Sequence, residues 1–342
     1  MKKILMVGPC YKTKGGISAV INAYQDSSIW NDFNIKWIET YYDKTNLLKI
    51  SYFFYGLISF LYHLPGSSII HIHLSEPVSA IRKLIFFIFG KLFFKPIIIH
   101  LHSFDSKTSI GGEFRRLYSF LFSKSNKVIV LSPYWANEVK KYIPNCQVEI
   151  IFNPCPKINK RDNKKEKIIL FACTLTKRKG YSVLIKSFAL IADKFPDWRL
   201  VFAGNGEVVE AKKLAEQLGI NKQVDFLGWI SGEEKNKIFS KSMIFCLPSF
   251  AEGFPMAILD AFSYGIPVLS TKCGRIDMVL KNNNNILFFE MGNVIELSNK
   301  LDNLMYNEEL RNKIGSNGYH FSQKNFELEV VVDKIKRIYI NI

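Results

Sequence analysis

The sequence lacks paired cysteines and lacks an apolar run long enough to cross a membrane. Its six cysteines stand singly, so no C-x-x-C pair indicates a zinc site or a redox motif. The longest apolar stretches fall short of the roughly 20 residues that a transmembrane helix needs. The apolar start is stopped by Pro9, Lys12 and Lys14, which argues against a signal peptide and favours a first β-strand. With no export signal, we expect the protein in the cytoplasm.

Motifs of several other functional classes are also missing. Residues 203–207 contain a lone Gly-x-Gly without the full G-x-G-x-x-G fingerprint or an acidic residue about 20 positions later, which disfavours a dinucleotide cofactor. No D-x-D sequence and no His/Cys cluster indicates a metal ion, so we expect none and assign its electrostatic role to cations of the protein. No recognised DNA- or RNA-binding motif is present, so only the net charge of +16 favours a nucleic-acid partner.

What the sequence does contain is a repeated alternation of short apolar, β-branched runs with helical stretches. A chain of 342 residues, 48% of them hydrophobic, is expected to form two domains. Continuous apolar strands that alternate with helices predict parallel sheets covered on both faces. The predicted strands overfill one sheet but divide well into two. They are Ile4–Val7, Ile35–Ile38, Ile69–His73, Ile97–Leu101, Val128–Leu131, Val148–Ile151, Ile168–Ala172, Leu200–Ala203, Val224–Phe226, Met243–Leu247, Val268–Thr271 and Ile286–Phe288.

A change in composition marks the boundary between the two predicted domains. Residues 153–167 contain two prolines and then a polar, charged run, which indicates a linker. We therefore expect Rossmann-like, doubly wound α/β domains at 1–155 and 156–320, facing each other across a cleft. A long helix from about Ser322 to Ile340, within 321–342, is expected to pack back towards the first domain. Ligands of open α/β sheets bind at the carboxyl ends of the strands, so function should lie in the strand-to-helix loops.

The first half of the chain is the more basic and holds two aromatic-rich apolar stretches. Residues 1–160 contain 20 Lys and Arg against 9 Asp and Glu, and a basic face attracts polyanions such as anionic lipid. The stretches Ile50–Leu64 and Leu84–Phe94 are typical of helices that lie on a membrane surface. A helix packed on a sheet explains each of them equally well. The basic residues at their edges are Lys49, Arg82, Lys83, Lys91 and Lys95.

Two loops at predicted strand ends are suited to binding a phosphate group. The first contains Gly15-Gly16 before a helix, and glycines at a helix N-terminus let backbone amides approach an anion. The second contains the cations Lys177, Arg178 and Lys179 before a helix start, an end that by itself prefers negative charge. A diphosphate between the cations and the helix would remove this conflict. The alternatives are an ordinary tight turn and a solvated basic loop.

The most informative segment runs from Glu252 to Asp260, after an apolar strand. Gly253 permits close approach of the backbone, and Pro255 suits the first position of a helix. A carboxylate accepts hydrogen bonds well from two vicinal hydroxyls, as on a ribose or a hexose. Alternatively, Glu252 caps the helix and Asp260 is a surface residue. Asp260 lies within an apolar stretch, however, where a buried unpaired charge would be costly, and a ligand hydroxyl would satisfy it.

This segment and several others resemble glycosyltransferase family 4, and the resemblance extends over the whole chain. It implies the two-domain GT-B fold and transfer with retention of anomeric configuration. The family motif E-G-F-P-x-x-x-x-E-A-x-x-x-G-x-P-V is matched, except that Asp260 stands where a second glutamate is usual. Thr174 stands where the family usually has an arginine, so Arg178 or Lys177 is expected to supply that charge. The matching residues are Glu252, Gly253, Phe254, Pro255, Ala261, Gly265, Pro267 and Val268.

The resemblance also implies roles for individual residues. Glu252 is expected near the transferred sugar and Asp260 on the nucleotide ribose, while Lys179 contacts the diphosphate and His102 lies near the donor sugar. The other donor-binding residues that we expect are Gly15, Gly16, Arg178, Gly204, Trp229, Gly253, Phe254, Met256 and Ala257.

We therefore expect a retaining glycosyltransferase that moves a hexose or N-acetylhexosamine from a UDP-, GDP- or TDP-sugar to a saccharide acceptor. The basic, aromatic first half favours a lipid-linked acceptor and peripheral binding to the anionic inner face of the plasma membrane, in bacterial-type surface polysaccharide assembly. No metal cofactor and no nucleic acid is expected. The alternatives are a sugar-nucleotide epimerase, a phosphorylase with a pyridoxal-phosphate lysine and, in another class, a basic nucleic-acid-binding protein.

Overall fold

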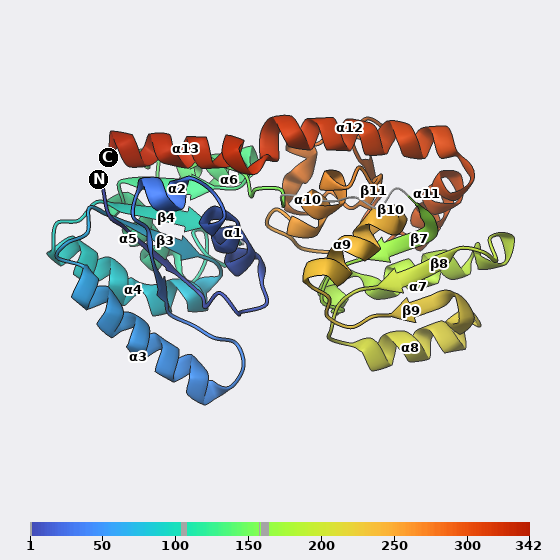
Figure 1. Cartoon of the computed structure of the whole chain (residues 1–342), viewed down its shortest axis with the longest axis horizontal. Helices are drawn as coiled ribbons and strands as arrows, with labels where there is room; N and C mark the ends of the chain where they lie inside the picture. The colour runs from blue at the N-terminus through green and yellow to red at the C-terminus, as the bar shows by residue number, and fades with distance from the viewer. Residues whose placement is uncertain (1, 104–107, 157, 159–163) are drawn as a thin grey trace. The chain divides into compact units, whose positions relative to one another are not determined.

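The computed structural model describes residues 2–103, 108–156, 158 and 164–342. The chain forms two compact units (Figure 1). We call Met1–Pro154 with Leu328–Ile342 the first domain and Cys155–Glu327 the second. Among the described residues, no helix combines the length and the apolar composition needed to cross a membrane.

The first domain is built on a parallel sheet with the strand order β2-β1-β3-β4-β5-β6. Every residue of β1, β3 and β4 is buried, because helices cover both faces of the sheet and leave no solvent-exposed side. The strands are β1 (Ile4–Gly8), β2 (Lys36–Glu39), β3 (Ile69–Leu74), β4 (Ile97–Leu101), β5 (Lys127–Val130) and β6 (Val148–Ile150).

Seven helices of the first domain surround this sheet. Figure 1 shows α3 and α4 on one side of the sheet and α13 on the other. α3 packs closely against the end of β2, because a side chain at Gly56 would place its Cβ 2.4 Å from the Glu39 carbonyl oxygen. The described helices are α1 (Gly16–Gln25), α2 (Ile29–Asp32), α3 (Asn46–His63), α4 (Pro77–Leu92), α5 (Arg115–Lys124), α6 (Pro133–Tyr142) and α13 (Leu328–Asn341).

The second domain repeats the same plan with the strand order β12-β11-β10-β7-β8-β9. β7 and β10 therefore lie in the middle, where the order reverses. The strands are β7 (Glu166–Phe171), β8 (Arg199–Phe202), β9 (Val224–Phe226), β10 (Ser242–Leu247), β11 (Val268–Ser270) and β12 (Leu287–Phe288). The α-helices are α7 (Tyr181–Ala189), α8 (Val208–Gln217), α9 (Gly232–Lys241), α10 (Met256–Ser263), α11 (Val294–Tyr306) and α12 (Glu308–Phe326), and the short 3₁₀ turn η1 (Lys177–Lys179) precedes α7.

These two doubly wound parallel sheets confirm the predicted fold class, and each predicted strand corresponds to an observed one. The single C-terminal helix predicted from Ser322 is wrong. α12 continues to Phe326, Glu327 takes an extended backbone (φ −55°, ψ 142°), and α13 begins at Leu328. Phe326 packs on Phe254 of the second domain, whereas Leu328 belongs to the first. The helix breaks because the chain passes from the second domain to the first at this point. The sequence does not predict the break, because no proline or glycine stands there.

Candidate active site

The reversal of strand order in the second sheet places two loops next to each other. β7 and β10 are neighbours, with Ile169 opposite Ile244, and the loops 172–180 and 248–255 leave the carboxyl ends of these strands. The N–H of Phe250 donates to the carbonyl oxygen of Arg178 at 2.8 Å, which ties the loops together. Ligands of open α/β sheets bind at such a switch point.

Glycine is required where these loops meet. Gly180 has a φ of +72°, and a Cβ there would lie 2.0 Å from the carbonyl oxygen of Pro248. Only a residue without a side chain adopts this backbone conformation and admits the other loop so closely. Gly180 thereby fixes the backbone that carries Lys179.

A partly buried ion pair joins the two loops. Lys179 Nζ donates to Glu252 Oε1 at 2.5 Å, and the side chains are only 15% and 7% exposed. Ser249 Oγ donates to the same oxygen at 2.7 Å, which leaves Oε2 without a hydrogen-bond partner among the described residues. Burial lowers the pKa of Lys179, but Cys173 and Glu252 raise it by more, so its net direction is upward. Lys179 therefore keeps its positive charge.

Asp260 forms a second ion pair, with a residue that the sequence analysis did not include. The carboxylate lies on α10 and is 9% exposed, and Lys235 Nζ from α9 donates to its Oδ1 at 2.7 Å. Asp260 is thus paired without a ligand, so burial of its charge does not by itself require a ligand hydroxyl. A lysine on a separate helix could not be assigned from the motif, because the contact depends on how α9 and α10 pack.

Both ion pairs lie around the thiol of Cys173, just after β7. Burial raises the pKa of Cys173 to about 12, and Lys179, Glu252, Asp260 and Lys235 all act on it electrostatically. The structure therefore brings together three of the predicted site residues and adds Lys235 and Cys173 to them. A thiol with so high a pKa stays protonated and is no nucleophile.

The start of α10 is open to a ligand. No side chain caps this helix, so the interpretation of Glu252 as its cap is wrong, and its carboxylate binds Lys179 instead. The amides of Met256 and Ala257 begin the helix, and unpaired amides of this kind favour anions or hydroxyls. The ring of Phe254 packs on Phe326 with centroids 5.4 Å apart, so the ring is part of the domain's packing.

The remaining predicted donor-binding residues differ in whether packing within the fold already explains them. A Cβ at Gly204 would lie 1.9 Å from the Cys173 carbonyl oxygen, so packing alone requires glycine there. Trp229 is 41% exposed, and its backbone N–H donates to Asn205 Oδ1 at 3.0 Å. Arg178 is exposed on η1. In the first domain, Gly15 precedes α1 and Gly16 begins it; a Cβ at Gly15 would meet no atom within 4 Å, so packing within the described fold does not explain this glycine.

His102 follows β4 and is part of a histidine cluster that the sequence analysis missed. Its Nε2 lies 2.7 Å from Nδ1 of His73, and the rings of His71 and His100 stack beside them. Burial lowers the pKa of His102 to about 3, so the ring is neutral at physiological pH. The sequence shows these histidines only as two separate pairs, which meet because β3 and β4 are neighbours in the sheet.

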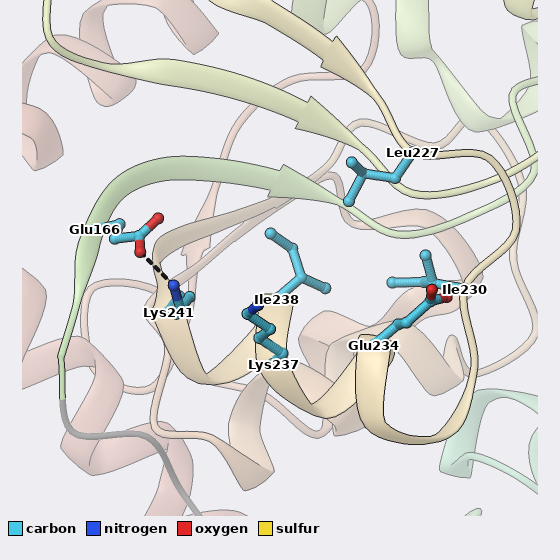
Figure 2. A pocket seen from close by; sticks show the side chains of 7 residues that line it. All are labelled: Glu166, Leu227, Ile230, Glu234, Lys237, Ile238 and Lys241. Atoms are coloured by element: carbon cyan, nitrogen blue, oxygen red, sulfur yellow. Dashed lines mark hydrogen bonds and ion pairs between the residues drawn. The ribbon is translucent and has the colours of Figure 1, made fainter.

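A pocket of about 360 Å³ also occurs beside α9 in the second domain (Figure 2). Figure 2 shows the ion pair of Lys241 and Glu166 at one end of the pocket, and the two charged atoms lie 2.5 Å apart. It contains none of the predicted site residues and does not coincide with the two ion pairs. Its lining residues are Glu166, Leu227, Ile230, Glu234, Lys237, Ile238 and Lys241.

Comparisons with known proteins bear on the family and the fold of the chain. Residues 157–321 match the family model described as glycosyl transferases group 1. An uncharacterized glycosyltransferase of Haemophilus influenzae is 30% identical over 53% of this chain, and the match spans about half (51%) of that relative. The matched part of the chain, which lies almost entirely in the second domain, is similar to the group 1 glycosyltransferases. The resemblance to family 4 is consistent with this similarity.

The chain is also similar to a named relative and to several solved structures. An Escherichia coli protein, UDP-Gal:alpha-D-GlcNAc-diphosphoundecaprenol alpha-1,3-galactosyltransferase, is 26% identical over 72% of this chain and 69% of its own length. Sucrose-phosphate synthase from Thermosynechococcus elongatus superposes with a TM-score of 0.81, at 15% identity, over 100% of this chain and 99% of its own. Anabaena Alr3699/HepE in complex with UDP and glucose superposes with a TM-score of 0.79, at 16% identity, over 100% of both chains. These structures show that the fold is GT-B.

Proposed function

We propose that this glycosyltransferase moves a hexose or N-acetylhexosamine from a UDP-sugar to a lipid-linked saccharide, with retention of anomeric configuration. The observation that carries the proposal is the partly buried pair of Lys179 and Glu252 at the switch point of the second sheet. It places a fixed cation and a carboxylate where an open α/β sheet binds its ligand. A nucleotide sugar needs both, because it combines a diphosphate with hydroxyl groups.

Lys179 is proposed to stabilise the departing diphosphate. An ammonium group has three donors, and Glu252 takes one of them, which leaves the others for phosphate oxygens. Negative charge grows on the diphosphate as its bond to the sugar breaks, and a cation already in place stabilises that charge without reorganisation. Arg178, exposed in the same turn, is proposed to supply the charge missing at Thr174.

The two carboxylates are proposed to hold the sugar and the ribose. Oε2 of Glu252 accepts from hydroxyls of the transferred sugar, and the second oxygen of Asp260 accepts from the ribose while Lys235 neutralises the first. If the acceptor attacks from the face that the diphosphate leaves, a phosphate oxygen takes its proton. Retention then requires no nucleophile from the protein. Neutral His102 serves as a hydrogen-bonding group for the sugar and not as an acid.

The donor should be a uridine nucleotide. The E. coli relative is named for UDP-Gal, and HepE was crystallised with UDP and glucose. A UDP-sugar at about 100 times its Kd stabilises the folded state by about 2.7 kcal/mol, which raises the Tm by about 5–10 °C. We expect this rise with UDP-glucose, UDP-galactose or their N-acetyl forms in a thermal-shift assay, and none with GDP-mannose or TDP-glucose.

A transfer assay with the stabilising donor and a lipid-linked saccharide completes this test. Formation of a new sugar nucleotide from the donor alone would identify an epimerase. Stabilisation by GDP- or TDP-sugars and not by UDP-sugars would contradict the proposed donor. Absence of product with every donor and acceptor would contradict the proposed reaction.

A membrane surface on α3 supports the lipid-linked acceptor. This helix buries only Gly56 and Phe60, and its outward side chains form an apolar stripe with Lys44 beside it. α4 buries more of its residues, among them Phe86 and Phe87, although Ile88 and Leu92 are exposed. Lys83, expected at the membrane, is buried with its ammonium bonded to the His73 carbonyl. We propose that α3 lies on anionic lipid. The exposed residues are Leu47, Ile50, Phe54, Tyr55, Ile58 and Tyr62.

Ile58→Glu should weaken binding to vesicles of phosphatidylglycerol and phosphatidylcholine by about tenfold, because burial of one such side chain contributes about 1.5–3 kcal/mol. The matched control is Ile295→Glu, since Ile295 is 61% exposed on α11 of the second domain and Ile58 is 69% exposed. Co-sedimentation at low salt measures the affinity. Equal binding of the two variants, or no binding by the unaltered protein, would refute the α3 surface.

A further inference from the structure

The register of two neighbouring strands gathers four histidines on one face of the first sheet. β3 and β4 lie side by side in Figure 1, with His73 opposite His100. Because side chains alternate between the faces of a strand, His71 joins His73 on this face, and His102 joins His100. The rings of Tyr24 from α1 and Tyr339 from α13 lie against the cluster. It is enclosed, since three of its histidines are wholly buried.

Several ring nitrogens of this cluster have no hydrogen-bond partner among the described residues. They are Nε2 of His71, Nε2 of His73 and both nitrogens of His100. A buried polar atom left unpaired costs about 1–3 kcal/mol, so a set of them in one place indicates a bound species that satisfies them. Lys83 does not satisfy these nitrogens, because its ammonium is directed to the His73 carbonyl oxygen and to Ser79 Oγ.

The hydrogen bonds that do exist leave the Nε2 atoms free to act as ligands. Nδ1 of His71 lies 2.6 Å from the hydroxyl of Tyr339, and Nδ1 of His73 lies 2.7 Å from Nε2 of His102. Histidines that bind metals are held in this way, with one nitrogen oriented by a hydrogen bond and the other on the ion.

We infer that His71, His73 and His100 bind one divalent transition-metal ion, such as Zn²⁺, inside the first domain. One nitrogen from each ring lies within 4.8 Å of those of the other two. Zinc–nitrogen bonds of about 2.0–2.1 Å bring such atoms to roughly 3.3 Å. The rings now lie nearly parallel, at 14–31° to one another, so binding requires them to turn towards the ion. Water or the buried, unpartnered hydroxyl of Tyr24 completes the coordination. The ion stabilises the fold, and the inference does not rest on the proposed sugar transfer.

Metal analysis of the full-length protein tests this inference. After purification without chelator, we expect about one zinc per chain by mass spectrometry of the dissolved metal. Protein stripped with a chelator should have a lower Tm that added Zn²⁺ restores. Co²⁺ in place of Zn²⁺ should give the intense visible absorption of a four-coordinate nitrogen site.

Two variants separate this site from adventitious binding. His100→Gln should lose the zinc, the cobalt absorption and the rise in Tm, whereas His320→Gln should keep all three, since His320 is exposed on α12 of the second domain. If His100→Gln does not fold, the zinc and cobalt titrations of the unaltered protein decide whether the cluster binds metal. If the unaltered protein contains no metal and does not respond to Zn²⁺ or Co²⁺, the inference is overturned. The unpaired nitrogens would then be satisfied by buried water.

Discussion

Replacing Glu252 with glutamine is expected to lower kcat for sugar transfer by about 10²–10³-fold, the effect of removing one electrostatic contact to a transition state. Glutamine keeps the shape of the side chain, and its carbonyl oxygen still accepts from Lys179 and Ser249. It loses the negative charge that is proposed to face the developing positive charge on the sugar. The Tm should fall less than in Lys179→Met below, because Lys179 loses its counter-charge but keeps a hydrogen bond to the amide oxygen, while transfer is nearly lost. Initial rates at saturating donor and acceptor measure the effect.

The control for this substitution is Glu166→Gln. Glu166 forms an ion pair of the same length, 2.5 Å, with Lys241, and it lies at the opposite end of β7 from the loop that carries Lys179. This variant should transfer sugar at the normal rate. Normal transfer by Glu252→Gln would instead show that the Lys179–Glu252 pair is structural and would remove the basis of the proposed site.

Replacing Lys179 with methionine is expected to lower both activity and stability. Transfer should fall by about 10²–10³-fold, because the diphosphate loses its fixed cation. The free energy of unfolding should fall by about 3–5 kcal/mol, because Glu252, only 7% exposed, is left as a buried charge without its partner. Urea unfolding measures the second effect and initial rates the first.

The double variant Lys179→Met/Glu252→Gln distinguishes a catalytic pair from a structural one. With no unpaired charge left, it should recover most of the stability lost in Lys179→Met. It should not recover transfer, because both groups proposed to contact the donor are gone. A double variant that is stable and active would contradict the proposed role of both residues.

The candidate site was only partly accessible to sequence reasoning. The motif identified Glu252 and Asp260, and the basic turn identified Lys179, because each belongs to a local pattern of residues next to a strand end. Lys235 has no such pattern, since it is one of several lysines on the polar helix α9 and only the packing of α9 beside α10 selects it. The same is true of α3 and α4, whose apolar stretches look alike although α3 buries only two residues and α4 buries six.

The sequence by itself determined the strands, the two doubly wound sheets and the loops that carry the site, because these depend on runs of neighbouring residues. Only the tertiary structure decided which side chains meet. The partners of Glu252 and Asp260 follow from the packing of β7, β10, α9 and α10. The histidine cluster follows from the register that sets His73 opposite His100. Contacts between elements depend on strand order and register, which no local run of residues encodes.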